Sequence, residues 1–233
     1  MHRLNSNALQ VLQDEVVQCR RCPRLIAHCA EVARVKRRAY RDWEYWGKPV
    51  PSFGDVDARV LVLGLAPGAH GSNRTGRIFT GDGSGDFFYP VLHEAGFASQ
   101  PRSVSRDDGM TLTGLWISAV VRCAPPANKP TPEELRNCSV WLDEEIRLLT
   151  NLRVVVCLGK IAFDAFLSHQ LRAGQISARA GFTFRHGAEY ALPGRLKLMA
   201  SYHPSLQNTN TGKLTRPMFL AVFKRVRQLA GWS

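Results

Sequence analysis

The sequence predicts an α/β fold, a three-layer α/β/α sandwich around a central sheet of four mostly parallel strands. Two observations carry this prediction. Four short apolar runs are spaced along the chain, and segments with helical signals separate them. This alternation is typical of a parallel sheet with helices on both faces. With 233 residues, the chain is also long enough to build one such domain around a full core.

The strands are expected where apolar runs end at glycine or at polar residues. The runs begin at Val60 (VLVL), Leu115 (LWISAVV), Arg153 (RVVVCL) and Leu196 (LKLMAS). In an open α/β sheet, ligands bind beyond the carboxyl ends of the parallel strands. We therefore expect the functional site in the segments that follow these runs, above all in the glycine-rich loop between residues 64 and 82.

The helices are expected between and around these runs. The segment from Thr131 has a good N-cap residue, Pro132 in the first helical position and acidic residues in the first turn. The last helix carries an apolar stripe that should pack on the sheet. Residues 173–194 are weakly patterned and predict a short hairpin. Helices are expected at residues 7–17, 86–96, 131–149, 161–171 and 215–229.

Composition favours a polyanionic partner. Lys and Arg number 31 against 19 Asp and Glu, which gives a net charge of +12. Nucleic acid fits this charge better than a membrane, because no apolar run is long enough to span a bilayer. The first residues lack the apolar core of a secretion signal, so we expect a cytoplasmic protein. We expect a single domain, with residues 1–58 forming a helical, cysteine-bearing and basic segment and residues 59–233 the α/β core.

Six cysteines in a cytoplasmic chain are expected to be thiols or metal ligands rather than disulfides. Cys19 and Cys22 form a close pair, and 14 residues separate Cys123 from Cys138. Four thiolates around one centre would suit zinc or an iron–sulfur cluster, and the spacing does not decide between them. The alternative is that Cys123 and Cys138 are ordinary buried thiols, which is also the interpretation we give to the two remaining cysteines, Cys29 and Cys157.

The loop after the first strand lacks the Gly-Lys-Ser/Thr of a phosphate-binding loop and the G-x-G-x-x-G dinucleotide pattern. It does contain an aromatic ring at Phe79, on which a nucleobase could stack, and a carboxylate at Asp82. His203 follows the fourth strand, at the sheet edge where sites assemble. The polar and basic side chains of the loop are His70, Asn73 and Arg74.

Taken together, three segments and the four cysteines resemble the uracil-DNA glycosylase superfamily, most closely its family-5 branch with an iron–sulfur cluster. The resemblance implies a monofunctional enzyme of base excision repair that hydrolyses the N-glycosidic bond of flipped-out uracil and leaves an abasic site. It also implies a broader choice of substrates that includes other deaminated bases. We expect activity on both single- and double-stranded DNA, and we expect a monomer, because the protein must bend DNA around one pocket. The segments are GLAPGAHGSNRTGRIFTGD from Gly64, RCAPPANKPTPEE from Arg122 and YHPSLQN from Tyr202.

The resemblance also implies roles for particular residues. Phe79 would stack on the flipped base, and His203 would donate a hydrogen bond to its carbonyl edge as negative charge develops there. Leu206 would be the wedge that fills the space left by the flipped nucleotide, and Gln207 and Asn208 would brace its loop or touch phosphate. The residues expected at a structural 4Fe-4S cluster are Cys19, Cys22, Cys123 and Cys138. Those expected at the base are Ala66, Phe79 and Asn128, and those expected at DNA are His70, Arg74, Ser205, Leu206, Gln207 and Asn208.

Two departures from related glycosylases place the chemistry further along the loop. Leu65 and Ala66 stand where relatives carry a polar, water-activating residue, and Ala119 stands where they read uracil with an asparagine. Asp82 is then the carboxylate expected to orient water or to stabilise the oxocarbenium-like sugar. Asn128 is a candidate contact to the base or the loop.

Two other functions fit parts of the sequence. One is a non-catalytic, metal-stabilised protein that binds nucleic acid or senses redox state, which would use the cysteines and the charge but not the loop. The other is a small-molecule α/β hydrolase or phosphate-handling enzyme that uses the glycine-rich loop. Release of free base from a uracil-containing oligonucleotide separates the glycosylase from both.

Overall fold

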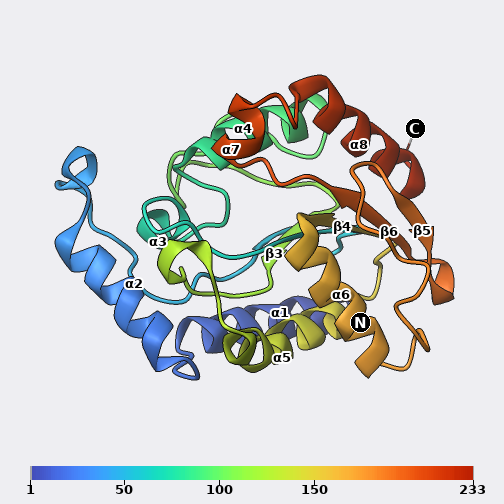
Figure 1. Ribbon diagram of the computed structural model, residues 1–233, viewed down its shortest axis with the longest axis horizontal. Coiled ribbons are helices and arrows are strands. Elements are labelled where there is room, and N and C mark those ends of the chain that lie inside the picture. The colour runs from blue at the N-terminus through green and yellow to red at the C-terminus, as the bar shows by residue number, and fades with distance from the viewer. Residues whose placement is uncertain (1, 233) are drawn as a thin grey trace.

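The computed structural model describes residues 2–232 and has a mixed sheet between two layers of helices (Figure 1). Within these residues the sheet has six strands in the order β1-β3-β2-β4-β6-β5. The predicted three-layer α/β/α architecture is confirmed. The strands are β1 (Phe53–Gly54), β2 (Val60–Gly64), β3 (Leu115–Ala119), β4 (Val154–Leu158), β5 (Glu189–Ala191) and β6 (Lys197–Ser201).

The four predicted strands form the parallel centre of the sheet, but the sheet is wider than predicted. β2, β3, β4 and β6 pair in parallel, with Val62 opposite both Ile117 and Val156. Two short antiparallel strands, β1 and β5, add one edge each. The sequence did not reveal them because β1 has only two residues and β5 alternates between exposed and half-buried positions, so neither forms an apolar run.

The helices lie on both faces of the sheet. In Figure 1, α4, α7 and α8 lie above it and α1, α5 and α6 lie below it. The short helices α3 and α7 and the longer α2 lie outside the ranges in which we expected helices. The bounds are α1 (His2–Val17), α2 (Pro23–Val35), α3 (Ser72–Thr75), α4 (Gly83–Glu94), α5 (Pro132–Leu148), α6 (Lys160–Arg172), α7 (Leu206–Asn210) and α8 (Arg216–Leu229), with 3₁₀ turns η1 (Arg38–Tyr40), η2 (Pro126–Asn128) and η3 (Pro193–Arg195).

Each face of the sheet has its own hydrophobic core, because successive side chains of a strand point to opposite faces. Val60 and Val62 of β2 pack with Phe88 of α4 and the phenylalanines of α8. Leu61 and Leu63 pack with side chains of α1, α5 and α6 on the other face. All five residues of β2 are buried, as expected for a central strand covered on both sides.

Two helix starts show how local chemistry sets the boundaries. Thr131 caps α5 as predicted: its hydroxyl accepts a hydrogen bond from the Glu134 N–H at 3.2 Å, and the Glu134 carboxylate accepts one from the Thr131 N–H at 2.7 Å. The second start differs from the prediction, because α4 begins at Gly83 and not at Asp86. Asp82 is its N-cap, and the carboxylate expected to be free in the loop is tied to the helix.

No helix among residues 2–232 is both long and apolar enough to cross a membrane.

Candidate active site

A pocket of about 510 Å³ opens at the carboxyl ends of β2, β3 and β6. This is the edge at which the sequence predicted a site. The loops that follow these three strands supply its walls together with the start of α4. Of the predicted site residues, those that line it are Ala66, Phe79, Asp82, Asn128, His203, Ser205, Leu206 and Gln207.

Phe79 forms an aromatic wall of this pocket. Its side chain is 6 % exposed, and its ring centroid lies 4.6 Å from that of Phe88, so the ring is fixed against the core. Gly64 lies near the tip of the ring, where an added Cβ would come within 3.2 Å of Phe79 Cζ. Phe79 also has a positive φ of 54°, a strained backbone conformation that aims the ring into the site.

His203 faces Phe79 in the pocket, with ring centroids 5.7 Å apart and ring planes inclined by 35°. It follows β6 directly, and its own carbonyl accepts a hydrogen bond of 2.9 Å from the Asn208 side chain. Burial lowers the pKa of His203 from 6.5 to about 4. The imidazole is therefore neutral at neutral pH and can donate one N–H without carrying a charge.

Asp82 presents one carboxylate oxygen to its own helix and leaves the other toward the loop. Oδ1 accepts hydrogen bonds from the N–H groups of Ser84 at 3.0 Å and Gly85 at 3.1 Å. Oδ2 packs on Gly71, where an added Cβ would come within 2.0 Å of it. Burial raises the pKa of Asp82, while the two N–H donors and the charge of Arg74 act in the opposite direction.

The loop after β6 carries an apolar side chain to the mouth of the pocket. Leu206 is 56 % exposed and rests against Gly83, where an added Cβ would lie 2.7 Å from Leu206 Cδ2. It opens α7, and Ser205 precedes it as the N-cap residue. An exposed leucine at a pocket mouth is free to contact a ligand. The bond from Asn208 to the His203 carbonyl places Asn208 as a brace of this loop rather than a pocket residue.

The rest of the lining offers few polar groups. Leu65, Ala66 and Ala119 contribute apolar surface, as their sequence positions led us to expect. Asn128 belongs to η2 with a left-handed φ of 56°, which asparagine tolerates better than most residues. Ser72, the first residue of α3, also lines the pocket. No sequence signal marked it, because a serine in a glycine-rich loop is commonplace.

His70 and Arg74, which we expected at the DNA surface, are not among the residues that line the pocket. Arg74 is only 4 % exposed, and its guanidinium carbon lies 3.9 Å from the ring centroid of Tyr40 and 4.1 Å from that of Trp43, two rings that are nearly perpendicular to each other. The His70 ring shares a hydrogen bond of 3.1 Å with the Tyr45 hydroxyl. The prediction that Arg74 contacts DNA is therefore corrected. Its side chain is buried and holds protein segments together, so it cannot contact a phosphate from this position.

The four predicted metal ligands line one small pocket that shares no lining residue with the active-site pocket. Cys19 follows α1, Cys22 precedes α2, Cys123 follows β3 and Cys138 lies in α5. Within residues 2–232, no three His, Cys, Asp or Glu side chains are placed to hold a metal ion. Cys29 and Cys157 are fully buried, in line with their interpretation as structural thiols.

Backbone and side-chain N–H groups already point at these cysteines. The Arg122 N–H donates to Cys138 Sγ at 3.3 Å, and the Asn137 side chain donates to Cys22 Sγ at 3.9 Å. The indole Nε1 of Trp141, which lines the same pocket, is buried and has no hydrogen-bond partner in the described part of the chain. Two of the sulfur atoms therefore already accept N–H hydrogen bonds, and one buried indole N–H of the same lining has no partner among the described residues.

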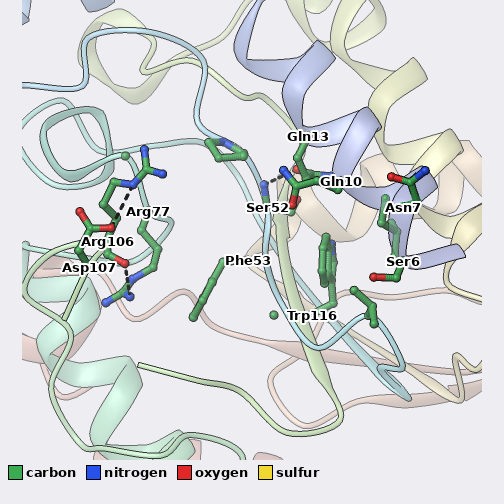
Figure 2. A pocket seen from close by; sticks show the side chains of 15 residues that line it. Ser6, Asn7, Gln10, Gln13, Ser52, Phe53, Arg77, Arg106, Asp107 and Trp116 are labelled. Carbon is green, nitrogen blue, oxygen red and sulfur yellow. Dashed lines mark hydrogen bonds and ion pairs between the residues drawn. The ribbon is translucent and has the colours of Figure 1, made fainter. Parts of the chain in front are cut away.

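A larger hollow of about 720 Å³ lies between α1, β1 and the loops around Arg77 and Arg106 (Figure 2). Its polar groups are mostly engaged within the protein. Gln13 bonds to Glu145 and to the Ser52 N–H, and Arg77 pairs with Asp108 at 2.6 Å. Size alone therefore does not make it the site, whereas the smaller pocket combines an aromatic wall, a neutral histidine and a carboxylate.

Sequence comparisons with known proteins identify the family of this chain. A family model described as the uracil DNA glycosylase superfamily matches residues 51–227. A protein of Thermus thermophilus named type-5 uracil-DNA glycosylase is 56 % identical, over 91 % of this chain and 94 % of that protein. A protein of Pyrobaculum aerophilum with the same name is 44 % identical, over 94 % of this chain and 92 % of that protein.

A more distant relative, a protein of Thermotoga maritima named type-4 uracil-DNA glycosylase, is 28 % identical over 75 % of this chain and 79 % of that protein. The type-5 proteins are thus clearly more similar than this type-4 protein. The chain belongs to the uracil DNA glycosylase superfamily and, within it, to the type-5 uracil-DNA glycosylases.

Proposed function

We propose that this protein is a DNA glycosylase that hydrolyses the N-glycosidic bond of uracil in DNA, releases the free base and leaves an abasic site. One observation carries the proposal: a buried, neutral histidine faces an aromatic wall in a pocket at the carboxyl ends of the parallel strands. A base inside a duplex cannot reach such a pocket, so the enzyme must take the nucleotide out of the stack. The test is release of free uracil from a uracil-containing oligonucleotide by the purified protein.

The pocket supplies the groups that leaving-group departure requires. Phe79 stacks on the flipped base, and the His203 N–H donates to a carbonyl oxygen of uracil. When the bond between the sugar C1′ and the base nitrogen breaks, its electron pair stays with the base, and negative charge develops on that oxygen. A fixed donor aimed at developing charge in a buried site stabilises the transition state more than the ground state.

Asp82 acts on the other side of the breaking bond. The sugar develops positive charge as the base leaves, and a nearby carboxylate stabilises that charge and orients the water whose oxygen bonds to C1′. Its Oδ1 is committed to the N–H groups of α4, so Oδ2 is the oxygen that faces this task. Leu206 at the pocket mouth fills the gap that the flipped nucleotide leaves in the duplex.

Replacing Asp82 by asparagine is expected to slow the chemical step by about 10²-fold. Asparagine keeps an oxygen that can cap α4 but removes the negative charge. Asp82→Ala additionally removes the cap and is expected to lower the free energy of unfolding by about 1 kcal/mol. Single-turnover excision and thermal unfolding of both variants separate the two effects; an Asp82→Asn enzyme as fast as wild type would rule out the catalytic role of the charge.

We further propose that other deaminated bases are substrates. The pocket has a volume within the usual range for small-molecule sites, and alanines line it at positions 66 and 119. Few polar groups are therefore present to reject a purine. A panel of oligonucleotides with uracil, hypoxanthine, xanthine or ethenocytosine, each single- and double-stranded, tests base and strand preference together. We expect a monomer, because a single chain supplies the residues that line the pocket. We expect it to act on DNA in the cytoplasm or nucleoid.

We propose that Cys19, Cys22, Cys123 and Cys138 hold a structural 4Fe-4S cluster. The donor set supports it: four thiols line one pocket, with N–H donors around them. In such a cluster each iron takes one thiolate, so the thiols surround the cluster and need not converge on one ion. When bound, the cluster would cross-link the ends of α1 and α2 to the segment after β3 and to α5. The side chains proposed for the chemistry at the base line a different pocket.

The purified protein is expected to be brown, with about four irons per chain. The buried Trp141 N–H is expected to donate to a sulfur of the cluster, and such bonds raise the reduction potential and protect the cluster. Trp141→Phe should therefore lower the potential and speed bleaching of the visible absorbance by a chelator. Trp232→Phe, which removes an indole from the opposite core, is the control. A colourless protein with stoichiometric zinc would contradict the cluster.

A further inference from the structure

A basic segment, residues 36–48, lies beside the pocket but outside its lining; we call it the arm. In Figure 1 this chain between α2 and β1 extends past α3 at the left edge of the molecule. The arm contains five cationic residues against two acidic ones. The cationic ones are Lys36, Arg37, Arg38, Arg41 and Lys48, and the acidic ones are Asp42 and Glu44.

Arg74 attaches the arm to the pocket loop. Its guanidinium packs against the rings of Tyr40 and Trp43, which belong to the arm. On its own side it donates from Nε to the His70 carbonyl at 2.8 Å and from a terminal nitrogen to the Gly81 carbonyl at 2.6 Å. Gly81 directly precedes Asp82, so one buried side chain links the arm to the catalytic loop.

Backbone contacts make this attachment rigid. The Trp46 N–H donates to the Arg74 carbonyl at 2.9 Å, and the Gly47 N–H donates to the Asn73 carbonyl at 3.0 Å. The Trp46 ring packs on Gly76, where an added Cβ would approach it to 2.8 Å. The arm is thus held in a fixed position relative to α3, although it presents a polar, highly charged sequence that would otherwise be expected to move.

Two arginines of the arm form no ion pair within the described residues. Arg37 and Arg38 are exposed, and neither has an ion-pair partner among residues 2–232. Neighbouring arginines differ, since Arg34 pairs with Glu31 at 2.6 Å and Arg41 lies 3.9 Å from the Asp42 carboxylate. Arg37 also lies close enough to His70 that its charge contributes, after burial, to lowering the pKa of that histidine.

We infer that the arm is a docking surface for the phosphate backbone of duplex DNA next to the flipped nucleotide, with Arg37 and Arg38 as its phosphate-binding residues. The inference rests on the proposed function in taking DNA as the polyanion. A pre-positioned basic surface loses little conformational entropy on binding, so it adds affinity without ordering a loop. Its anchor to the loop of Asp82 would hold the pocket at a fixed distance from the bound backbone.

The test is the salt dependence of binding to an undamaged duplex. Each phosphate contact contributes about −0.9 to the slope of log K against log salt concentration. The double variant Arg37→Gln/Arg38→Gln is expected to reduce the magnitude of the slope by about 1.8 between about 50 and 200 mM salt. The control is Arg153→Gln/Arg195→Gln. It removes the same charge from exposed positions at the amino ends of β4 and β6, the sheet edge away from the pocket.

If the slope is smaller in magnitude for the arm variant and unchanged for the control variant, the arm is a docking surface for the DNA backbone. If both variants reduce the slope equally, the effect follows net charge alone and the inference is wrong. If neither variant changes the slope, Arg37 and Arg38 do not contact phosphate and the inference is wrong as well. This measurement uses DNA without uracil and needs no excision. A wild-type protein that releases no uracil would therefore reject the proposed function, while the salt slopes would still decide the role of the arm.

Discussion

Replacing His203 by alanine is expected to lower the rate of uracil excision by about 10²- to 10³-fold, the usual cost of removing one donor to a developing oxyanion. The neutral imidazole lies in the pocket opposite Phe79, and no other histidine is among the residues that line it within the described chain. We propose its N–H as the donor to the base carbonyl. The loss should appear in the single-turnover rate with enzyme in excess, where weaker DNA binding cannot imitate it.

A conservative variant separates the hydrogen bond from the shape of the pocket. His203→Gln keeps an N–H donor and is expected to retain more activity than His203→Ala, although the donor is not aimed in the same way. Both variants keep the Asn208 bond to the backbone carbonyl of residue 203, so the loop should stay in place. If the alanine variant excised uracil at the wild-type rate, the assigned role of His203 would be wrong.

The protonation of His203 gives this prediction a second measurement. Its pKa is about 4 in the folded protein against 6.5 for an exposed histidine, because burial disfavours the charged ring. The unfolded chain therefore takes up this proton first, and the contribution of His203 to stability falls as the pH drops from about 6.5 toward 4. A side-chain NMR titration, assigned by comparison with His203→Gln, should show a neutral ring at pH 6; a midpoint near 6.5 would contradict the neutral donor.

Replacing Glu145 by glutamine is expected to lower the free energy of unfolding by about 3–5 kcal/mol. Glu145 is fully buried in α5, and its Oε2 lies 2.5 Å from the Arg122 guanidinium, which is itself 1 % exposed. The variant keeps the size of the side chain but leaves the arginine charge buried without a counter-charge. The same carboxylate accepts hydrogen bonds from Gln13, Trp116 and Ser118.

The adjacent residue provides a matched control. Glu144 pairs with Arg147 on the surface of the same helix, so Glu144→Gln is expected to cost less than about 1 kcal/mol. Denaturant unfolding followed by circular dichroism compares the two. Because Arg122 precedes Cys123 and its N–H binds Cys138, Glu145→Gln should also reduce the iron content. Equal stability of the two variants would show that the buried pair does not hold this face together.

The central strands could be predicted because their signal is local. Four runs of apolar residues sit at β2, β3, β4 and β6, and a strand covered on both faces needs such a run. The edge strands β1 and β5 could not be found in this way. They form because a neighbouring strand offers free N–H and C=O groups, and the short segments themselves carry no periodicity.

The start of α4 was missed for a related reason. Gly83 and Gly85 are poor helix formers, so the sequence predicts a loop up to Asp86. In the folded protein the Asp82 carboxylate satisfies two N–H groups of the first turn. Gly85 is needed there, because an added Cβ would lie 1.9 Å from the Phe79 carbonyl. Close packing between the helix and the pocket loop decides this boundary.

The burial of Arg74 could not be predicted from the sequence either. An arginine in a glycine-rich loop of a basic protein was expected at the DNA surface. Its burial depends on Tyr40 and Trp43, more than thirty positions earlier in the chain, whose rings both pack against its guanidinium. No local pattern relates these three residues.

The sequence by itself determined the parallel sheet, the position of the pocket at its carboxyl edge, and the residue types that the chemistry requires. Strand patterns and motifs hold this information over a few neighbouring residues. Only the tertiary structure decided which side chains face the pocket, which charge is buried and what the arm is attached to. Those outcomes depend on contacts between residues far apart in the chain, where burial and hydrogen-bond geometry set the energy.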